Sequence, residues 1–340
     1  MSDKVSKKQI TRRTVLSGVG TVAGVALAGL LPTKSRASHA NDDATDHSGG
    51  HQMGVVGECT SGTLDPDAYL TEFDWGKATP LGGGKTLREY EFVAIDKEIE
   101  IAPGLFFPAW TYNGRVPGPT IRANEGDTIR VNFHNSGSHP HTIHFHGFHP
   151  PAMDGSMPDQ VVEVGETFVY EFEAAPFGLH LYHCHSLPLK RHIHKGLYGT
   201  FIVDPPGGRP PAREFIMGMN GFDTNFDGDN EVYAVNSVAH HHMRHPIPVL
   251  VGELVRLYVV NFTEFDPVNS FHIHATLFNE FRTGTKLEPD YFTDTTMLCQ
   301  GERTILEMVF PMPGMYMFHA HQSEFAELGW MGLFDARESL

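Results

Sequence analysis

The sequence predicts an all-β protein with two β-sandwich domains in tandem, and three observations support this fold class. Short runs of alternating apolar and polar residues, such as residues 128–133, recur between Gly, Pro, Asn and Asp from about Arg88 onward, as half-buried strands do. No long stretch shows the 3.6-residue period of a helix. Several segments also occur twice along the chain, which indicates a duplicated domain.

The composition agrees with this fold and excludes several classes of function. The chain has 340 residues, enough for two domains, and its 35 Gly and 23 Pro suit a turn-rich β protein. The formal net charge of −16 disfavours nucleic acid and anionic membranes as partners. Three cysteines cannot form a disulfide-rich scaffold, whereas 22 histidines are a surplus that needs a chemical explanation.

Residues 1–40 are predicted to be a twin-arginine signal peptide. Arg12 and Arg13 precede an apolar run that ends at Leu31, and Ser38-His39-Ala40 forms a small-residue cleavage site. Because the run is short and broken by glycines, cleavage is preferred over a membrane span. We therefore expect an exported, periplasmic or extracellular protein with no membrane span in its mature form. Residues 41–85, polar and Gly-rich at first, are predicted to be an N-terminal extension.

The repeat divides the remaining chain into two predicted domains, residues 86–205 and 206–340. The segments 125–131 and 251–257 correspond, and each precedes a His-x-His pair. A second pair follows in each domain at an equivalent position. The Pro- and Gly-rich run 204–211 cannot form a strand ladder, so it is the predicted linker.

The four repeated histidine pairs predict metal sites. In a strand, His-x-His places both imidazoles on one face, about 6.6 Å apart along the chain. Two such pairs from adjacent strands can converge on metal. Neutral imidazoles without a carboxylate or thiolate suit copper, zinc or iron. The pairs are His144/His146, His183/His185, His272/His274 and His319/His321.

One cysteine narrows the choice of metal. Cys184 lies between two histidines of one pair and points to the opposite strand face, where His141 and His192 are candidates to join it. A His, Cys, His set with a weak or absent axial ligand is the trigonal blue-copper arrangement. The axial position falls on Leu197, which cannot coordinate a metal. The sequence therefore predicts a three-ligand copper site.

These motifs resemble the copper signatures of the multicopper oxidases, and most closely those of the two-domain, laccase-like members. The resemblance rests on the segments 141–147 and 183–197, and on Asn113-Gly-Arg-Val-Pro-Gly-Pro119 and Met153-Asp154-Gly155 upstream. It covers nearly all of residues 88–340. It implies two cupredoxin-like Greek-key β-sandwich domains and four copper ions per chain, one of type 1 and three in a trinuclear cluster of one type 2 and two type 3 ions.

The resemblance also implies the ligands of each copper. By position, the type 1 ligands are His141, Cys184 and His192, the type 2 ligands are His144 and His272, and the type 3 ligands are His146, His183, His185, His274, His319 and His321. The second repeat departs from the type 1 pattern at every ligand position. It has Asn269, Ala320, Phe325 and Trp330 there, so each chain is expected to carry one type 1 copper, in domain 1.

The resemblance implies the activity of a multicopper oxidase. A phenol, aromatic amine or metal ion would give electrons to the type 1 copper, and O₂ would be reduced to water at the cluster. Two-domain relatives close a ring of three chains, so we expect a homotrimer with intersubunit clusters; a monomer with an intrachain cluster is the alternative. Glu324 and Asp154 are the candidate catalytic proton donors.

Two other functions stay open at this stage. Copper nitrite reductases, which convert nitrite to nitric oxide, share the two domains and resemble the ending from Glu324 to Gly329. Those enzymes hold a single type 2 copper with three histidines and use an Asp beside the substrate. In this chain the relevant position of the first repeat is His144, and His185 follows the cysteine. Both differences favour the trinuclear cluster. The third reading is a copper or electron carrier without turnover, which would not need eight cluster histidines.

Three smaller features carry weaker expectations. The run 223–229 resembles the start of a calcium loop but lacks the acidic residue at position twelve, so a turn is expected. The histidines between His240 and His245 are expected to form a polar loop, with a place at the border of the substrate entrance or metal binding as the alternatives. Spacing alone leaves open whether Cys59 and Cys299 pair.

Overall fold

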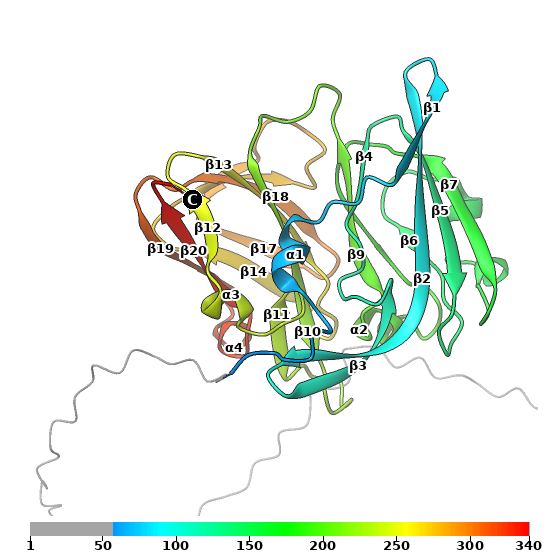
Figure 1. The fold of residues 1–340 in the computed structure, drawn as a ribbon, viewed down its shortest axis with the longest axis horizontal. Coiled ribbons are helices and arrows are strands. Elements are labelled where there is room, and N and C mark those ends of the chain that lie inside the picture. Colours follow the sequence, from blue (N-terminus) through cyan, green and yellow to red (C-terminus); the bar gives the residue numbers. More distant parts are fainter. Residues whose placement is uncertain (1–56, 340) are drawn as a thin grey trace, which may run out of the picture. The chain divides into compact units, whose positions relative to one another are not determined.

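The computed structural model describes residues 57–339; the predicted signal peptide and the first part of the predicted extension lie outside them. The described residues form four β-sheets (Figure 1), two from residues 77–204 and two from residues 213–337. We call these two parts the first half and the second half. The predicted all-β fold class is confirmed, since the longest α-helix among the described residues has six residues. None of these helices has the length and apolar character needed to cross a membrane.

The first half consists of a five-stranded and a four-stranded sheet. The alternating run predicted from residue 128 onward forms β5, and it buries Ile129, Val131 and Phe133 on one face. In the larger sheet β1, β2, β5 and β7 follow one another and β3 also pairs with β2; in the smaller sheet the order is β4, β9, β8, β6. The strands are β1 Lys77–Gly82, β2 Lys85–Ala102, β3 Leu105–Tyr112, β4 Ile121–Asn124, β5 Thr128–Asn135, β6 His144–Phe145, β7 Thr167–Glu173, β8 Gly178–His183 and β9 Tyr198–Asp204.

The second half repeats this pairing scheme. Its parallel pairs β10–β13 and β12–β20 correspond to β2–β5 and β4–β9 of the first half. One sheet has the order β11, β10, β13, β18, β15, β16, and the other has β12, β20, β19, β14, β17. The strands are β10 Arg213–Phe222, β11 Val232–Val235, β12 Ile247–Leu250, β13 Leu254–Asn261, β14 Val268–Ile273, β15 Phe278–Arg282, β16 Tyr291–Thr293, β17 Thr295–Cys299, β18 Arg303–Val309, β19 Gly314–His319 and β20 Met331–Arg337.

Short helices lie in the connections between strands. In the first half α2 connects β8 to β9, and α4 connects the corresponding strands β19 and β20 in the second half. The helix α3 lies between β11 and β12. The helices are α1 Pro66–Thr71, α2 Leu189–His194, α3 His241–Arg244 and α4 Ser323–Glu327, with 3-10 turns η1 Pro151–Met153 and η2 Pro158–Gln160.

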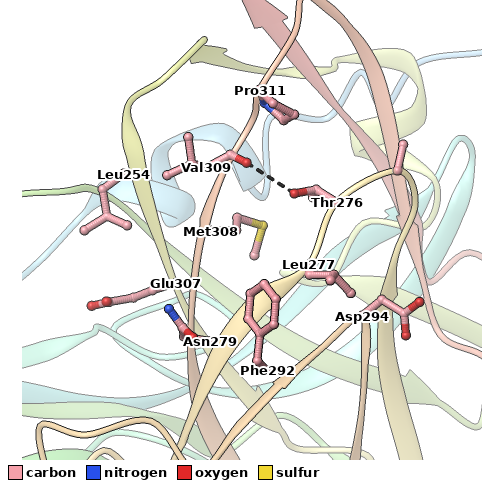
Figure 2. A pocket seen from close by; sticks show the side chains of 11 residues that line it. Leu254, Thr276, Leu277, Asn279, Phe292, Asp294, Glu307, Met308, Val309 and Pro311 are labelled. Atoms are coloured by element: carbon pink, nitrogen blue, oxygen red, sulfur yellow. Dashed lines mark hydrogen bonds between the residues drawn. The ribbon is translucent and has the colours of Figure 1, made fainter.

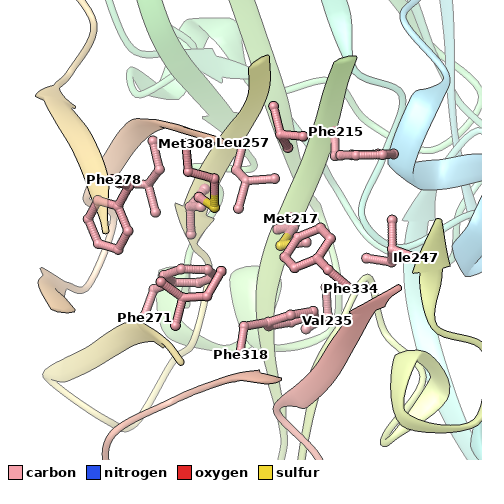
Figure 3. Packing of buried hydrophobic residues seen from close by; sticks show 14 of the residues in the cluster. Phe215, Met217, Val235, Ile247, Leu257, Phe271, Phe278, Met308, Phe318 and Phe334 are labelled. Carbon is pink, nitrogen blue, oxygen red and sulfur yellow. The ribbon is translucent and has the colours of Figure 1, made fainter. Parts of the chain in front are cut away.

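Each half has its own hydrophobic core, and a third cluster joins the two. Figure 3 shows the core of the second half, where Phe271 and Phe318 stack with ring centroids 5.8 Å apart and Phe334 packs beside them. The joining cluster combines first-half side chains such as Leu179 with second-half side chains such as Ile305. The halves are therefore held together by buried apolar surface, the main stabilising contribution in such contacts.

A buried ion-pair network also crosses between the halves. Arg122 on β4 contacts Asp204 at 2.7 Å and Glu214 on β10 at 2.6 Å. Glu214 in turn contacts Arg256 at 2.9 Å, and Arg256 contacts Glu307 at 2.7 Å. Since every carboxylate in this network faces a guanidinium, the burial of these charges is compensated.

Part of the predicted extension packs on both halves. Asp65 caps α1, because its side chain accepts a hydrogen bond from the Ala68 backbone N–H. Leu70 of α1 lies in the core of the second half, and Figure 1 shows α1 against β10. The strand β1 pairs with β2 in the first half. Residues 66–82 of the predicted extension thus form ordered structure.

The remaining small features of the sequence have simple local structures. All three cysteines are free, so Cys59 and Cys299 do not pair within the chain. The loop that begins at Asp223 is a turn in which the carboxylate of this residue accepts hydrogen bonds from the backbone N–H groups of Phe226, Asp227 and Gly228. Those carboxylate oxygens are committed to the backbone of the turn.

Candidate metal centres

Cys184 and two histidines form a buried triad in the first half. Cys184 follows the end of β8, His192 lies on α2, and His141 precedes β6. The Cys184 Sγ lies 3.3 Å from His192 Nδ1 and 3.9 Å from His141 Nδ1, and the two Nδ1 atoms are 3.2 Å apart. At most 2% of each residue is exposed. The structure therefore brings together the three residues that the sequence predicted as a copper site.

The donor chemistry of this triad fits a metal ion. Burial lowers the pKa of His141 to about 3 and of His192 to about 4, so both imidazoles are neutral and have a lone pair at neutral pH. Burial raises the pKa of the Cys184 thiol, so its thiolate form needs a cation partner. Ligand atoms about 2.0–2.3 Å from one ion lie about 3.0–3.7 Å apart, close to the three distances found here.

Hydrogen bonds position Cys184, and large side chains enclose the triad. The Cys184 N–H donates to the Leu197 carbonyl at 2.9 Å, and the Thr142 N–H lies 3.4 Å from Cys184 Sγ. Leu197 is fully buried in the same apolar cluster as Cys184. The Trp110 ring covers His192 and His141, with ring centroids 4.8 and 5.5 Å apart. Trp110 lies on β3, far away in sequence, and sequence reasoning did not find it.

The four other predicted ligands of the first half form a quartet. In the register of β6 and β8, His144 lies directly opposite His183. The His144 ring centroid is 5.3 Å from those of His146 and His183 and 5.4 Å from that of His185. His146 Nε2 and His183 Nε2 are 3.2 Å apart. We call these four residues the first quartet.

Hydrogen bonds orient the rings of the first quartet. His144 Nδ1 donates to the Asp154 carbonyl at 2.8 Å, and His183 Nδ1 donates to the Cys184 carbonyl at 2.9 Å. A carbonyl only accepts, so each Nδ1 carries the proton and each Nε2 has a lone pair for a metal. Burial lowers the pKa of His146 to about 3 and of His183 to about 4, which keeps these rings neutral.

The second half builds a matching second quartet from His272, His274, His319 and His321. His272 lies opposite His319 in the register of β14 and β19, as His144 does to His183. The His274 Nε2 and His319 Nε2 atoms are 3.1 Å apart. His272 Nδ1 donates to the Asp294 carbonyl at 2.9 Å and His319 Nδ1 to the Ala320 carbonyl at 2.7 Å. The two quartets thus share one local design, and both fit metal ions.

In each pair the second histidine lies one or two residues after the end of its strand. The strands β8 and β19 end at His183 and His319, and β14 ends one residue before His274. The paired ring centroids are 5.1–5.9 Å apart, closer than the roughly 6.6 Å expected for a continuing strand. The end of the ladder leaves the second ring free to turn toward the first.

The two quartets do not meet within one chain. No hydrogen bond or ring contact joins them among residues 57–339. The first quartet lines a cavity of about 350 Å³ together with Glu264 and Gln300 of the second half. The second quartet adjoins a cavity of about 650 Å³ (Figure 2), because Asp294, which accepts from His272, is part of its wall. Phe292 and Leu277 give this wall exposed apolar surface.

The positions that correspond to the triad in the second half are filled by core packing. Ala320, Phe325 and Trp330 all belong to the hydrophobic core there, and Asn269 is fully buried. The structure places no thiolate or imidazole at any of these four positions. This agrees with the expectation that only the first half has a triad.

The two predicted proton donors have different surroundings. The Asp154 carboxylate lies 3.4 Å from His144 Nδ1 and 3.7 Å from His149 Nε2, and it accepts a hydrogen bond from Ser156. Burial opposes ionisation of Asp154, but Ser156 and the nearby histidines outweigh it and lower its pKa. Glu324 is the second residue of α4 and is exposed. His149, which sequence reasoning missed, is brought to Asp154 by a proline-rich turn with no periodic pattern.

Two β-sandwich halves with a buried His, Cys, His triad and two histidine quartets define a cupredoxin-like copper protein. Residues 96–208 and residues 209–339 each match the family described as multicopper oxidase. The chain therefore belongs to the multicopper oxidase family.

Three similar proteins have different names within this group of copper proteins. A crystal structure described as a multicopper oxidase is 54% identical, has a TM-score of 0.80, and matches 81% of this chain and 98% of its own. The copper-containing nitrite reductase of Neisseria gonorrhoeae is 30% identical over an alignment of 251 residues, and the match covers 67% of this chain and 62% of that protein. The L-ascorbate oxidase of Cucurbita maxima is 42% identical over 130 residues, 36% of this chain and 20% of that protein. The chain thus spans less than two thirds of the length of these two relatives.

Proposed function

We propose that this protein is a laccase-like oxidase that takes single electrons from a phenol, an aromatic amine or a metal ion and reduces O₂ to water. The observation that carries the proposal is the presence of two complete histidine quartets in addition to the triad. A nitrite reductase site needs three histidines, whereas two quartets supply eight. When bound, a type 1 copper would accept electrons from the donor, and a trinuclear copper cluster would reduce O₂.

The ligand assignment is the one that the resemblance to the multicopper oxidases implies. The triad of His141, Cys184 and His192 would hold the type 1 copper. His144 and His272 would hold the type 2 copper. The two type 3 coppers, which complete four copper ions per chain, would be held by the remaining quartet members: His146, His183, His185, His274, His319 and His321.

The chain itself provides a short route between the triad and the first quartet. Cys184 is covalently bonded through the backbone to His183 and His185, which flank it. The Cys184 carbonyl also accepts the hydrogen bond from His183 Nδ1 at 2.9 Å. Electrons that arrive at the Cys184 sulfur therefore need to cross only one residue to reach two quartet side chains.

Asp154 and Glu324 are proposed as proton donors to O₂ reduction. The Asp154 carboxylate beside His144 can accept a proton from solvent and pass it on to the first quartet during turnover. Ser156 and His149 fix the position of the Asp154 carboxylate. Glu324 lies three residues after His321, so it follows the second quartet closely along the chain.

We further propose a homotrimer with the clusters between subunits. The quartets are separate in one chain, and a ring of three chains would let the first quartet of each subunit meet the second quartet of its neighbour. Exposed apolar residues accompany both quartets: Phe148 and Leu187 in the first half, and Met312 and Met315 in the second. Such residues suit burial in a subunit interface.

The domain boundaries and the cellular localisation are part of the same proposal. Residues 86–205 would form domain 1 and residues 206–340 domain 2, after a twin-arginine signal in residues 1–40 and an extension over residues 41–85. Export through the twin-arginine pathway would place the folded protein in the periplasm or outside the cell.

A nitrite reductase is the second candidate function. It is favoured by the relative from Neisseria gonorrhoeae and by a carboxylate, Asp154, beside the histidine His144. Such an enzyme would reduce nitrite to nitric oxide and hold two coppers per chain.

Copper stoichiometry and turnover decide between these functions. We expect about four coppers per chain and O₂ uptake with a phenolic donor, without nitrite consumption. Two coppers per chain and nitrite consumption would establish the second candidate instead. If the copper-loaded protein consumes neither O₂ nor nitrite with any strong one-electron donor, the oxidase proposal is wrong and a carrier role remains.

A further inference from the structure

A second group of metal-binding side chains lies away from the triad and the quartets. His241 and His242 belong to α3, and Asp67 belongs to the first turn of α1. His241 Nε2 lies 3.1 Å from Asp67 Oδ1, and His242 Nδ1 lies 3.8 Å from the same oxygen. The three donor atoms all lie within 4.8 Å of one another. None of these residues contributes to the sites proposed above.

His242 is buried without a hydrogen-bond partner. Only 1% of its side chain is exposed, and neither Nδ1 nor Nε2 forms a hydrogen bond among the described residues. A buried imidazole normally has at least one partner, because loss of its water contacts must be compensated. His242 is therefore a buried polar side chain whose Nδ1 faces Asp67 and whose two ring nitrogens have no hydrogen-bond partner among the described residues.

The contact between His241 and Asp67 also differs from an ordinary hydrogen bond. The two atoms are 3.1 Å apart, yet His241 Nε2 has no partner with hydrogen-bond geometry among the described residues. Two neighbouring ligands, each about 2.1 Å from one ion, lie about 3.0–3.4 Å apart and point at the ion instead of at each other. The distance between His241 Nε2 and Asp67 Oδ1 lies in the range expected for two ligands of one ion.

The backbone holds both histidines in place. Asn236, Ser237 and His240, just before α3, all have positive φ angles of 51–75°. The segment is tied to the strands around it: Ser237 N–H donates to Asn220 at 2.8 Å, and His240 N–H donates to the Gly329 carbonyl at 3.0 Å. α1 is anchored by Leu70 in the core of the second half. The three ligands are thus presented by a rigid scaffold.

We propose that Asp67, His241 and His242 bind one divalent transition-metal ion of the zinc class. Two imidazoles and one carboxylate are a common ligand set for Zn²⁺, with water completing the coordination. Asp67 is more than half exposed, so an ion can reach the site from solvent. The bound ion joins α1 to α3 and so clamps the N-terminal segment onto the second half.

The neighbouring pair of Glu58 and His245 provides a matched control. His245 Nε2 is bonded to Glu58 at 2.9 Å, and its ring stacks on His241 with centroids 4.6 Å apart. His245 is thus a histidine at the end of the same short helix that is committed to another carboxylate. Glu288 is an exposed carboxylate with no ion pair among the described residues, and it controls for the loss of one negative charge.

The test uses the full copper-loaded protein equilibrated with Zn²⁺, desalted, and analysed for both metals. Wild type, His245→Gln and Glu288→Gln should retain about one Zn²⁺ per chain, and Zn²⁺ should raise their Tm. Asp67→Asn and His241→Gln should bind Zn²⁺ at least about tenfold more weakly, with unchanged copper content and blue absorbance.

Two outcomes would overturn the proposal. One is wild-type protein that retains no Zn²⁺ while its copper sites are full. The other is Zn²⁺ retention by Asp67→Asn and His241→Gln equal to wild type, or equal loss in His245→Gln. Both ligand variants lie at the protein surface or at its edge, so the copper content and Tm of each variant without zinc verify that it is folded.

Discussion

At the scale of single residues, the two halves differ most at one pair of equivalent positions. Cys184 in the first half and Ala320 in the second are both fully buried and both lie between two quartet histidines. Cys184 faces His141 and His192, whereas Ala320 packs in an apolar core with Phe325 and Trp330. The equivalent position therefore belongs to a Cys, His, His triad in one half and to an apolar core in the other.

Replacement of this cysteine tests the division of the sites. Cys184→Ser should abolish the intense blue absorption, because a serine hydroxyl cannot provide a thiolate bond to copper. About three coppers per chain should remain, since both quartets are untouched. Visible absorption, paramagnetic resonance and metal analysis on the same sample check this. Blue colour retained by the variant would show that the triad is not the type 1 site.

Asp154→Asn tests the proposed proton donor. The amide keeps the size of the side chain but cannot supply a proton, so turnover with O₂ should fall about 100-fold. Copper content and blue absorbance should stay at wild-type values. Asp159→Asn, an exposed carboxylate on the same loop, is the matched control. Wild-type turnover by Asp154→Asn in steady-state O₂ uptake would exclude this role, and Glu324→Gln in the same assay tests the second candidate.

At the scale of elements, one buried carboxylate connects the N-terminal segment to a β-hairpin. Glu100, near the end of β2, accepts backbone N–H bonds from Ser61 at 2.8 Å, Thr60 at 3.0 Å and Gly104 at 2.9 Å. Gly104 has a φ of 74°, a turn conformation that favours glycine. Only 2% of Glu100 is exposed. The hydrogen bonds from Gly104 and Ser61 outweigh burial and lower the pKa of Glu100 to about 2.

This contact predicts an acid-dependent loss of stability. A carboxyl with a lowered pKa in the folded protein stabilises it above the ordinary pKa, and this contribution is lost as the pH falls from about 4.5 toward 2. Glu100→Gln should be less stable than wild type by about 1–2 kcal/mol at pH 7. The difference should shrink toward pH 2. Denaturant unfolding across this pH range measures it, and a pH-independent difference would contradict the assignment.

At the scale of the whole molecule, the sequence predicts what is local and repeated but not what is distant. The triad and both quartets come from short motifs whose spacing reflects strand geometry, so the residues that meet in each group could be predicted from the sequence alone. The contacts of Trp110 with His192 and of Asp67 with His241 join residues from different elements. No periodicity marks such pairs, because only the packing of α1 and β3 on the rest of the chain creates them.

The proposed homotrimer makes a prediction that differs from the one for a cluster within a single chain. In a trimer with intersubunit clusters, each cluster combines the first quartet of one chain with the second quartet of its neighbour. His146→Gln damages only the first quartet and His274→Gln only the second. Each variant alone should therefore be inactive with O₂, although each should keep its blue type 1 site.

Co-expression of the two variants should restore activity. With random mixing, about one quarter of the interfaces pair an intact first quartet with an intact second quartet, so O₂ uptake should reach about one quarter of the wild-type value. Purification through two different tags selects the mixed trimers, in which this fraction rises to about one third. If each cluster instead lay within one chain, every cluster would contain a damaged histidine, and the mixed sample would be as inactive as either parent.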